Sequence, residues 1–335
     1  DSDIVHFNGD YLEDRELLSQ ESIHKLSLLI GNKSTIFIDE GQRIDNIGTI
    51  LKILTDHYKD KKQIIVTGSS SIHLLDKTGE PLTGRKIVFR MFPVSTEEFA
   101  LSRTPKELIS SLEDLLIYGL YPKVLNQTSY ADKVRELVEL TTSNLYKDIL
   151  EFQSIRNPSH LSKLLKAIAL QIGSEVSLNE IAGMIGLNVR TVERYIDLLE
   201  KSYIIFRLPP YFTNKRKELT KMNKIFFYDL GIRNAIIHNF NRLSDRNDVG
   251  GLFENFMVVE RLKYRSYHNI YADQYFWKEY NGKEIDLIEE HSGQLHAYEF
   301  KWTKTPVKAP IAFTNAYPDH TYIGINRNNF TDIVL

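Results

Sequence analysis

The hydrophobic pattern of the first hundred residues predicts strands that alternate with helices. Residues 35–38 form an unbroken apolar and β-branched run, which is typical of a strand buried on both faces of a parallel sheet. Residues 63–68 form a second such run, and residues 4–7 form a shorter one. Apolar residues at helical spacing occupy residues 15–30 and 47–58, between these runs. Because strand, helix and strand in this order imply parallel neighbours joined by a right-handed crossover, we expect a doubly wound α/β layer.

Two adjacent carboxylates, Asp39 and Glu40, directly follow the first of these runs. Open α/β sheets bind their ligands at the carboxyl ends of their strands. In a nucleotide hydrolase, an acid at this place holds Mg²⁺, usually through water, and a second acid orients the attacking water. Asp39 is the candidate for the first role and Glu40 for the second. The alternative is a buried strand that runs into an acidic turn.

Polar residues also follow the next predicted strand, where Thr67, Ser69 and Ser70 stand. A polar side chain at this point can reach a γ-phosphate or the attacking water, so Thr67 and Ser69 are candidate nucleotide sensors. The alternative is a serine-rich turn that caps the following helix. We expect the sensor residues to face the same crevice as Asp39 and Glu40.

No phosphate-binding loop of the form G-x-x-x-x-G-K-[ST] occurs in the sequence. The nearest match begins at Gly79, but it has Arg85 where the motif has lysine and Lys86 where it has a hydroxyl residue. It also precedes a predicted strand at residues 86–89 instead of following one, so we reject it. We expect the true loop to belong to a strand and helix before residue 4, and the chain to start after it.

Length and composition bound the class of protein. The 335 residues have room for two or three domains, and 42% hydrophobic with 26% charged residues is ordinary for a soluble globular protein. No run has the length of a membrane span, and the first residues lack the charged and apolar regions of a signal peptide. The absence of cysteine excludes disulfides and thiolate metal sites and fits a cytoplasmic location. The net charge of −2 predicts no nonspecific attraction to nucleic acid, so DNA binding would need a local basic patch.

Residues 100–170 have a helical pattern, with one predicted helix over residues 134–152. We interpret this region as a helical lid of the nucleotide layer. Arg135 is then a candidate phosphate contact, and the alternative is an ordinary surface arginine.

A helix-turn-helix pattern follows. Ser177 and Glu180 have the spacing of a capping box, residues 186–188 form a turn, and residues 189–199 form a second helix. Apolar strands at residues 203–208 and 224–228 would supply a wing. The candidate DNA contacts are Arg190, Thr191 and Arg194 at the start of the second helix, and Lys215, Arg216, Lys217, Lys221 and Lys224 in the wing. The alternative is a winged helix that serves only as a packing module.

The last hundred residues predict a helix over residues 252–262 and strands at residues 274–278, 284–288 and 295–302, with an Asn-Gly hairpin turn before the second strand. The set Asp286, Glu299 and Lys301 resembles the PD-(D/E)xK nuclease core, in which acids coordinate Mg²⁺ and the lysine positions the nucleophile or stabilises charge. Strand alternation puts Glu299 and Lys301 on one face, and Glu254 on the helix would complete the cluster. The alternative is a sheet with an ordinary glutamate and lysine.

Four motifs in order resemble those of a prokaryotic family of AAA-type ATPases: residues 37–42, 66–71, 82–85 and 92–99. In that family a winged helix and a C-terminal domain of unknown function, similar to restriction endonucleases, follow the nucleotide domain. The resemblance implies that Asp39 and Glu40 form the Walker B pair, that Thr67 and Ser69 belong to the sensor strand, and that Arg85 is a phosphate-sensing or finger arginine. The absent P-loop is the departure from the family.

The expected organisation is therefore an ATPase core truncated at its start (1–100), a helical lid (101–165), a winged helix (166–230) and a restriction-endonuclease-like domain (231–335). The expected function is an ATP-binding and ATP-hydrolysing switch that uses ATP and Mg²⁺. Two alternatives stay open: a Mg²⁺-dependent nuclease regulated by the nucleotide domain, and a noncatalytic protein that binds DNA or another partner. A finger arginine that acts across subunits would require a homo-oligomer.

Overall fold

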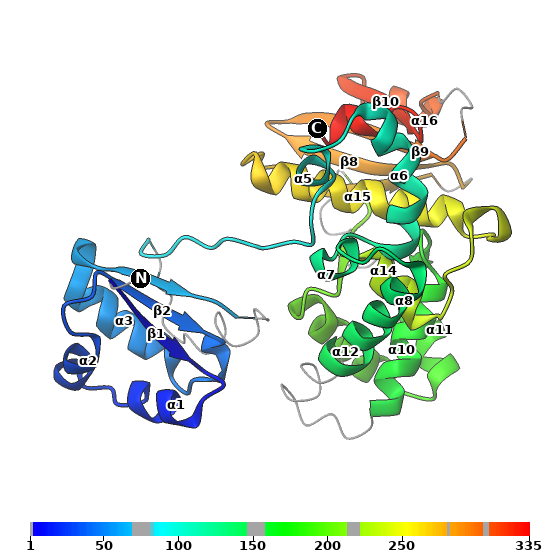
Figure 1. Cartoon of the computed structure of the whole chain (residues 1–335). Helices are drawn as coiled ribbons and strands as arrows, with labels where there is room; N and C mark the ends of the chain where they lie inside the picture. Colours follow the sequence, from blue (N-terminus) through cyan, green and yellow to red (C-terminus); the bar gives the residue numbers. More distant parts are fainter. Residues whose placement is uncertain are drawn as a thin grey trace. The chain divides into compact units, whose positions relative to one another are not determined.

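The computed structural model describes residues 3–68, 82, 84–145, 158–212, 222–279, 282–303 and 308–335. It divides into two compact units, whose elements are labelled in Figure 1. The first comprises Asp1–Phe89 with Lys201–Tyr203, and the second comprises Arg90–Glu200 and Ile204–Leu335.

The first unit is built on a three-stranded parallel sheet in the order β1-β2-β3. This confirms the predicted parallel α/β layer. The helix predicted over residues 47–58 is also confirmed, with the same bounds. The elements are β1 (Ile4–Asn8), α1 (Leu12–Leu18), α2 (Ile23–Ile30), β2 (Thr35–Asp39), α3 (Ile47–Tyr58) and β3 (Gln63–Val66).

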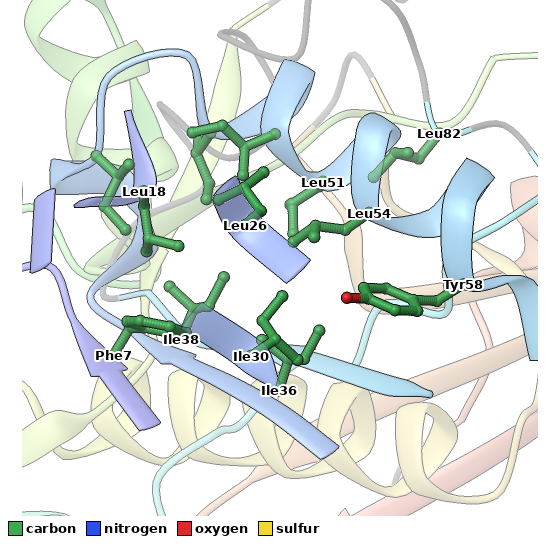
Figure 2. Packing of buried hydrophobic residues seen from close by; sticks show 13 residues of the cluster. Phe7, Leu18, Leu26, Ile30, Ile36, Ile38, Leu51, Leu54, Tyr58 and Leu82 are labelled. Carbon is green, nitrogen blue, oxygen red and sulfur yellow. The ribbon is translucent and has the colours of Figure 1, made fainter. Parts of the chain in front are cut away.

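The hydrophobic core of this unit lies between β2 and the helices α2 and α3. Ile36 and Ile38 of β2 are fully buried against Leu26 of α2 and Leu54 of α3, as Figure 2 shows. Phe37 points to the opposite face, where it is half-buried and stacks on a histidine of β1. The strand is thus fully buried on one face and only half-buried on the other.

Two predictions for this unit are wrong. The helix predicted over residues 15–30 is two helices, because the chain leaves the helix at Ser19, whose hydroxyl donates to the Arg15 carbonyl, and restarts after Ser22. Residues 86–89 form no strand, and Ile87 and Phe89 are more than 80% exposed. A strand needs a hydrogen-bonded neighbour, and within the described residues this segment has none.

The second unit begins with helices. Two capping boxes, Ser95 with Glu98 and Thr104 with Glu107, start its first two helices. The helix predicted over residues 134–152 begins earlier, at Tyr130, and passes after Glu139 into a π-helix (Leu140–Leu145). Residues 146–152 of this prediction lie outside the described residues. The helices are α5 (Thr96–Ala100), α6 (Pro105–Tyr118), α7 (Pro122–Leu125), α8 (Tyr130–Glu139), α10 (Pro158–Leu170) and α14 (Leu230–Ile236).

The predicted helix-turn-helix is present, with a turn at Gly186, whose φ of 73° is left-handed. The predicted wing strands pair antiparallel, in a three-stranded sheet of order β4-β6-β5. The elements are β4 (Glu175–Val176), α11 (Leu178–Ile185), α12 (Val189–Lys201), β5 (Ile205–Leu208) and β6 (Asn223–Phe227).

The C-terminal elements form a four-stranded mixed sheet in the order β10-β9-β8-β7. Strands β7, β8 and β9 are antiparallel, and β10 is parallel to β9. The long helix α15 lies against β9 (Figure 1). The elements are α15 (Val249–Tyr267), β7 (Asp273–Lys278), β8 (Glu284–His291), β9 (Gln294–Lys301), α16 (Ile311–Ala316) and β10 (His320–Asn326).

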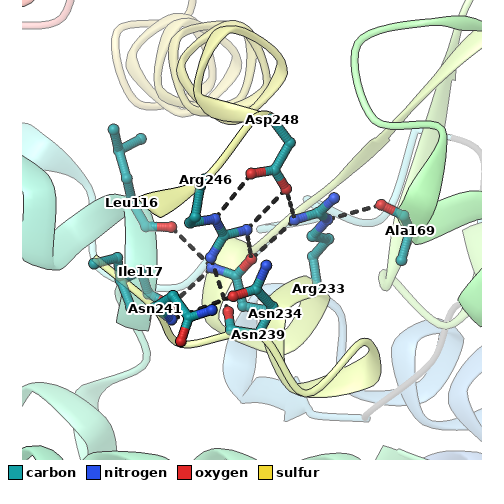
Figure 3. A network of polar contacts seen from close by, with 9 residues as sticks. All are labelled: Leu116, Ile117, Ala169, Arg233, Asn234, Asn239, Asn241, Arg246 and Asp248. Carbon is teal, nitrogen blue, oxygen red and sulfur yellow. Dashed lines mark hydrogen bonds and ion pairs between the residues drawn. The ribbon is translucent and has the colours of Figure 1, made fainter. Parts of the chain in front are cut away.

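A buried polar network, drawn in Figure 3, fixes the start of α15. Asp248 accepts hydrogen bonds from Arg233 Nη1 at 2.6 Å and from Arg246 Nε at 2.8 Å. Arg233 Nε also donates to the carbonyl of Ala169 in α10, and Asn234 donates to two carbonyls at the end of α6. The residue that precedes α15 is therefore bonded to α14 and, through residues of α14, tied to α6 and α10; α15 carries Glu254.

Candidate functional site

The first candidate site lies at the carboxyl edge of the parallel sheet. Asp39 is the last residue of β2, Glu40 follows it, and Thr67 follows β3. The Thr67 hydroxyl donates a hydrogen bond to Asp39 Oδ1. Backbone bonds from Thr67 N to Ile38 O and from Gly41 N to Thr67 O, both 2.9 Å, hold the two strand ends together. The structure thus brings Asp39, Glu40 and Thr67 to one place, whereas Ser69 lies outside the described residues.

Glu40 has an unusual conformation and environment. Its φ of 48° is left-handed, a conformation that costs a non-glycine residue about 1 kcal/mol or more. Burial raises the pKa of its carboxyl group, and the nearby Asp10 and Asp39 add to this effect. The buried Gln42 donates its side-chain amide to Glu40 Oε2, which favours the ionised form. Gln42 was given no role from the sequence, although it belongs to the first of the four motifs, and it contacts Glu40 directly.

Gly9, at the end of β1, supports the same two carboxylates. Its backbone N–H donates to the Asp39 carbonyl at 2.8 Å. A Cβ atom at this position would lie only 2.2 Å from the carbonyl oxygen of Glu40, so only glycine fits here. The next residue, Asp10, forms an ion pair of 2.9 Å with Arg43.

The two predicted phosphate-contacting arginines have other partners in the structure. Arg85 forms an ion pair with Asp56 of α3, with both side chains about half exposed. Arg135 pairs with Asp132 of its own helix at 2.9 Å and is 74% exposed. Exposed ion pairs of this kind contribute little stability, so both arginines can change partners at small cost.

The second candidate site is a carboxylate cluster between α15 and the C-terminal sheet. Asp286 of β8 accepts a hydrogen bond of 2.7 Å from the Phe300 backbone N–H. Lys301 of β9 lies with Nζ 2.5 Å from Glu299 Oε1 and 3.7 Å from Asp286 Oδ2. The structure therefore brings together three of the four residues predicted here. The fourth, Glu254 on α15, lies beside them and pairs with a residue that was not predicted to belong to this cluster.

That residue is Lys224 of β6, which is fully buried. Its Nζ donates to Glu254 Oε1 at 2.7 Å and lies 3.5 Å from Glu284 Oε1. The prediction that Lys224 belongs to an exposed basic wing is wrong, because β6 packs against α15 and its lysine points into the cluster. The other predicted wing residues, Lys215, Arg216, Lys217 and Lys221, lie outside the described residues.

The electrostatics of the cluster reflect an excess of buried acid. Burial raises the pKa of Glu254 to about 8 and that of Glu299 to about 7, and the Asp286 charge adds to both shifts. Burial raises the pKa of Asp286 as well. Burial alone would lower the pKa of Lys224, but Glu254 and Asp286 outweigh it and raise the pKa. Within the described ranges, no three acidic or histidine side chains are already arranged around a position for a metal ion.

The third group of predicted residues lies on α12. Arg190 and Arg194 are exposed and stand one helical turn apart. Thr191 instead takes part in the helix start, since its N–H and hydroxyl donate to Asn188 Oδ1 at 2.8 and 3.0 Å.

Comparison with known families divides the chain into three parts. Residues 1–100 match the model of an AAA domain. Residues 109–243 match a domain of unknown function, DUF8612, and residues 249–329 match another, DUF4143. The AAA match indicates nucleotide binding, typically with Mg²⁺, and a possible ATPase. The other two matches assign no activity.

Similar proteins are uncharacterized. Proteins of Mycobacterium tuberculosis and Mycobacterium bovis are each 26% identical over 281 residues, which cover 83% of this chain and 61% of the relative. A protein of Methanocaldococcus jannaschii is 24% identical over 308 residues, with 84% of this chain and 66% of the relative covered. The chain thus spans about three fifths of the length of the mycobacterial relatives. No solved structure matches it.

A helix that crosses a membrane needs about 20 predominantly apolar residues. In the part of the chain that the structure describes, no helix has both the length and the apolar character that a crossing needs.

Proposed function

We propose that the intact gene product is an AAA-type ATPase that works as a nucleotide-dependent switch. The observation that carries the proposal is the meeting of Asp39, Glu40 and Thr67 at the carboxyl edge of a parallel sheet, within the stretch that matches an AAA domain. Ligands of open α/β sheets bind at this edge. The four ordered sequence motifs support the same assignment.

The residues at this edge fit one part of a nucleotide site. Carboxylate and hydroxyl oxygens are ligands that suit Mg²⁺, so Asp39 would hold the ion, with Thr67 beside it. When bound, Mg²⁺ would neutralise negative charge that develops on the nucleotide phosphates. The motif of a phosphate-gripping loop does not occur in this sequence, so the proposal is made for the intact gene product.

Glu40 would orient and activate the attacking water. Its carboxylate is held by the amide of Gln42, and its left-handed backbone is held in place by the close approach of Gly9. The raised pKa makes it a stronger base than an exposed glutamate. Thr67 keeps Asp39 oriented, and Arg85 is the candidate for sensing phosphate or acting as a finger across a subunit boundary in a homo-oligomer.

The decisive experiment is steady-state ATP hydrolysis by the intact gene product and its Glu40→Gln variant. We expect kcat to fall by about 10²-fold or more, because the variant cannot accept a proton, while nucleotide binding is kept. Glu13→Gln, which neutralises an exposed acid on α1, is the matched control and should leave kcat unchanged. Hydrolysis that is equally fast in Glu40→Gln would reject the proposal.

A metal-dependent nuclease is the second candidate function. The observation that favours it is the gathering of Asp286, Glu299 and Lys301, with Glu254 near enough for the Asp286 charge to raise its pKa. In such a site the acids would hold Mg²⁺ and Lys301 would stabilise charge. Purified protein with Mg²⁺ or Mn²⁺ should cut DNA or RNA, and Asp286→Ala should not. Equal cleavage by both, or by neither, would reject this candidate.

A further inference from the structure

A buried lysine occupies the carboxylate cluster from outside the C-terminal sheet. Lys224 of β6 has no exposed surface, and its Nζ lies 2.7 Å from Glu254 Oε1 and 3.5 Å from Glu284 Oε1. The ring of Phe276 lies 5.5 Å from the same nitrogen and covers it on another side. A buried ammonium group is stable only where carboxylates compensate its desolvation, so these contacts define a site built for a cation.

The cluster holds more acid than its lysines neutralise. One carboxylate oxygen, Glu299 Oε2, is buried without a hydrogen-bond partner. The carboxylates are Glu254, Glu284, Asp286 and Glu299, and the ammonium groups that face them are those of Lys224 and Lys301.

We propose that Lys224 is an internal cation that competes with a divalent metal ion for Glu254 and Asp286. This inference deepens the nuclease candidate and rests on it, because it concerns the same cluster. A metal ion bound by Glu254 would need the carboxylate oxygen that now accepts the hydrogen bond from Lys224. The metal ion and the ammonium group would both be positively charged and bound to the same carboxylate, so they would repel each other. The cluster accordingly binds a metal weakly while the ammonium group is in place, and more tightly when that group withdraws or is removed. Because Lys224 belongs to the sheet of the helix-turn-helix region, that region controls access of metal to the cluster.

The test measures binding of Mn²⁺ alone by calorimetry, and the shift of Tm that Mn²⁺ causes, in wild type and Lys224→Met. We expect wild type to bind Mn²⁺ weakly with a small rise of Tm, and the variant to bind Mn²⁺ about tenfold or more tightly than wild type with a larger rise. The variant should be destabilised without metal, since Glu254 loses its partner, and Mn²⁺ should restore its Tm.

Lys263→Met is the matched control. Lys263 is equally buried and lies at the same distance of 2.7 Å from an acid, Glu260, but it stands outside the cluster. This variant should lose stability and gain no Mn²⁺ binding. A gain as large as that of Lys224→Met would overturn the proposal, because it would show that any lost buried lysine has this effect.

Two further results would overturn the proposal. One is tight, saturable Mn²⁺ binding by wild type that Asp286→Asn abolishes, a measurement that does not depend on the folding of a lysine variant. The other is a folded Lys224→Met variant whose affinity for Mn²⁺ is no higher than that of wild type. If Lys224→Met does not fold, the same measurement is made on Lys224→Gln, whose side-chain amide can still donate to Glu254. Mn²⁺ binding by the variant without cleavage of DNA or RNA would keep the role of Lys224 and reject the nuclease candidate alone.

Discussion

Gly9→Ala tests whether the backbone around Glu40 has to be as tight as the structure makes it. The new Cβ would lie 2.2 Å from the Glu40 carbonyl oxygen and 3.3 Å from that of Asp39, whereas ordinary contact begins at 3.4 Å. The strand end and Glu40 must therefore separate by about 1 Å, because both partners of the clash are backbone atoms that cannot rotate away. A displacement of about 1 Å at a catalytic group costs about 10²-fold in rate. We expect a fall of this size in kcat for ATP hydrolysis, although no functional side chain changes.

The same substitution should lower stability by about 1–3 kcal/mol in urea unfolding, as overpacking does. This sign is informative, since Gly→Ala at an open position stabilises by about 0.4–1 kcal/mol. Gly183→Ala in α11, where no atom lies within 4 Å of the new Cβ, supplies the matched comparison and should stabilise. If Gly9→Ala kept kcat within twofold and lost no stability, the tight packing of β1 against Glu40 would not position the base.

Three further predictions concern charge. Gln42→Leu removes the hydrogen-bond donor that favours ionised Glu40, so the acid limb of the pH profile of kcat should move to higher pH. If that limb does not move, Gln42 does not set the pKa of Glu40. Burial works to raise the pKa of Asp248, but hydrogen bonds from two arginines outweigh it and lower the pKa to about 2. The stability that ionised Asp248 provides is complete above the unfolded pKa of about 3.9 and is lost as the pH falls towards 2. In urea unfolding at pH 5, Asp248→Asn should therefore be less stable than wild type. The difference in unfolding free energy between the two proteins should become smaller as the pH is lowered. Replacing Arg190 and Arg194 together by alanine should reduce the slope of log K for DNA against log salt by about 2, and an unchanged slope would exclude DNA contact by these residues.

The parts of the fold that could be predicted from sequence have a local cause. The bounds of α3 and the position of Asp39 at a strand end follow from apolar spacing and from the charge that ends the run. The pairing of Glu299 with Lys301 follows from strand alternation. In each case the residues that decide the structure lie within a few positions of one another.

The errors concern features that depend on distant partners. In sequence Lys224 stands beside Lys221 and other basic residues, and a lysine is almost always exposed. Its burial depends on carboxylates 30 and 60 residues away, which no local pattern reports. Residues 86–89 have the composition of a strand, but a strand forms only where a neighbour supplies hydrogen bonds.

The contacts between β6 and α15 set the cost of any change that withdraws Lys224. The Asn255 side chain accepts a hydrogen bond from the Phe227 N–H at 2.9 Å and donates one to the Phe227 carbonyl at 2.8 Å, and all of these groups are buried. Moving β6 away would leave them and the Lys224 and Glu254 pair unsatisfied, at about 1–3 kcal/mol for each buried group. A ligand can shift an equilibrium only by the difference between its affinities for the two states. An effector that opens the cluster by moving β6 must therefore bind the open state more tightly than the closed state by several kcal/mol. A rotation of the Lys224 side chain alone would leave the Asn255 hydrogen bonds intact, so it would need a smaller difference in binding free energy.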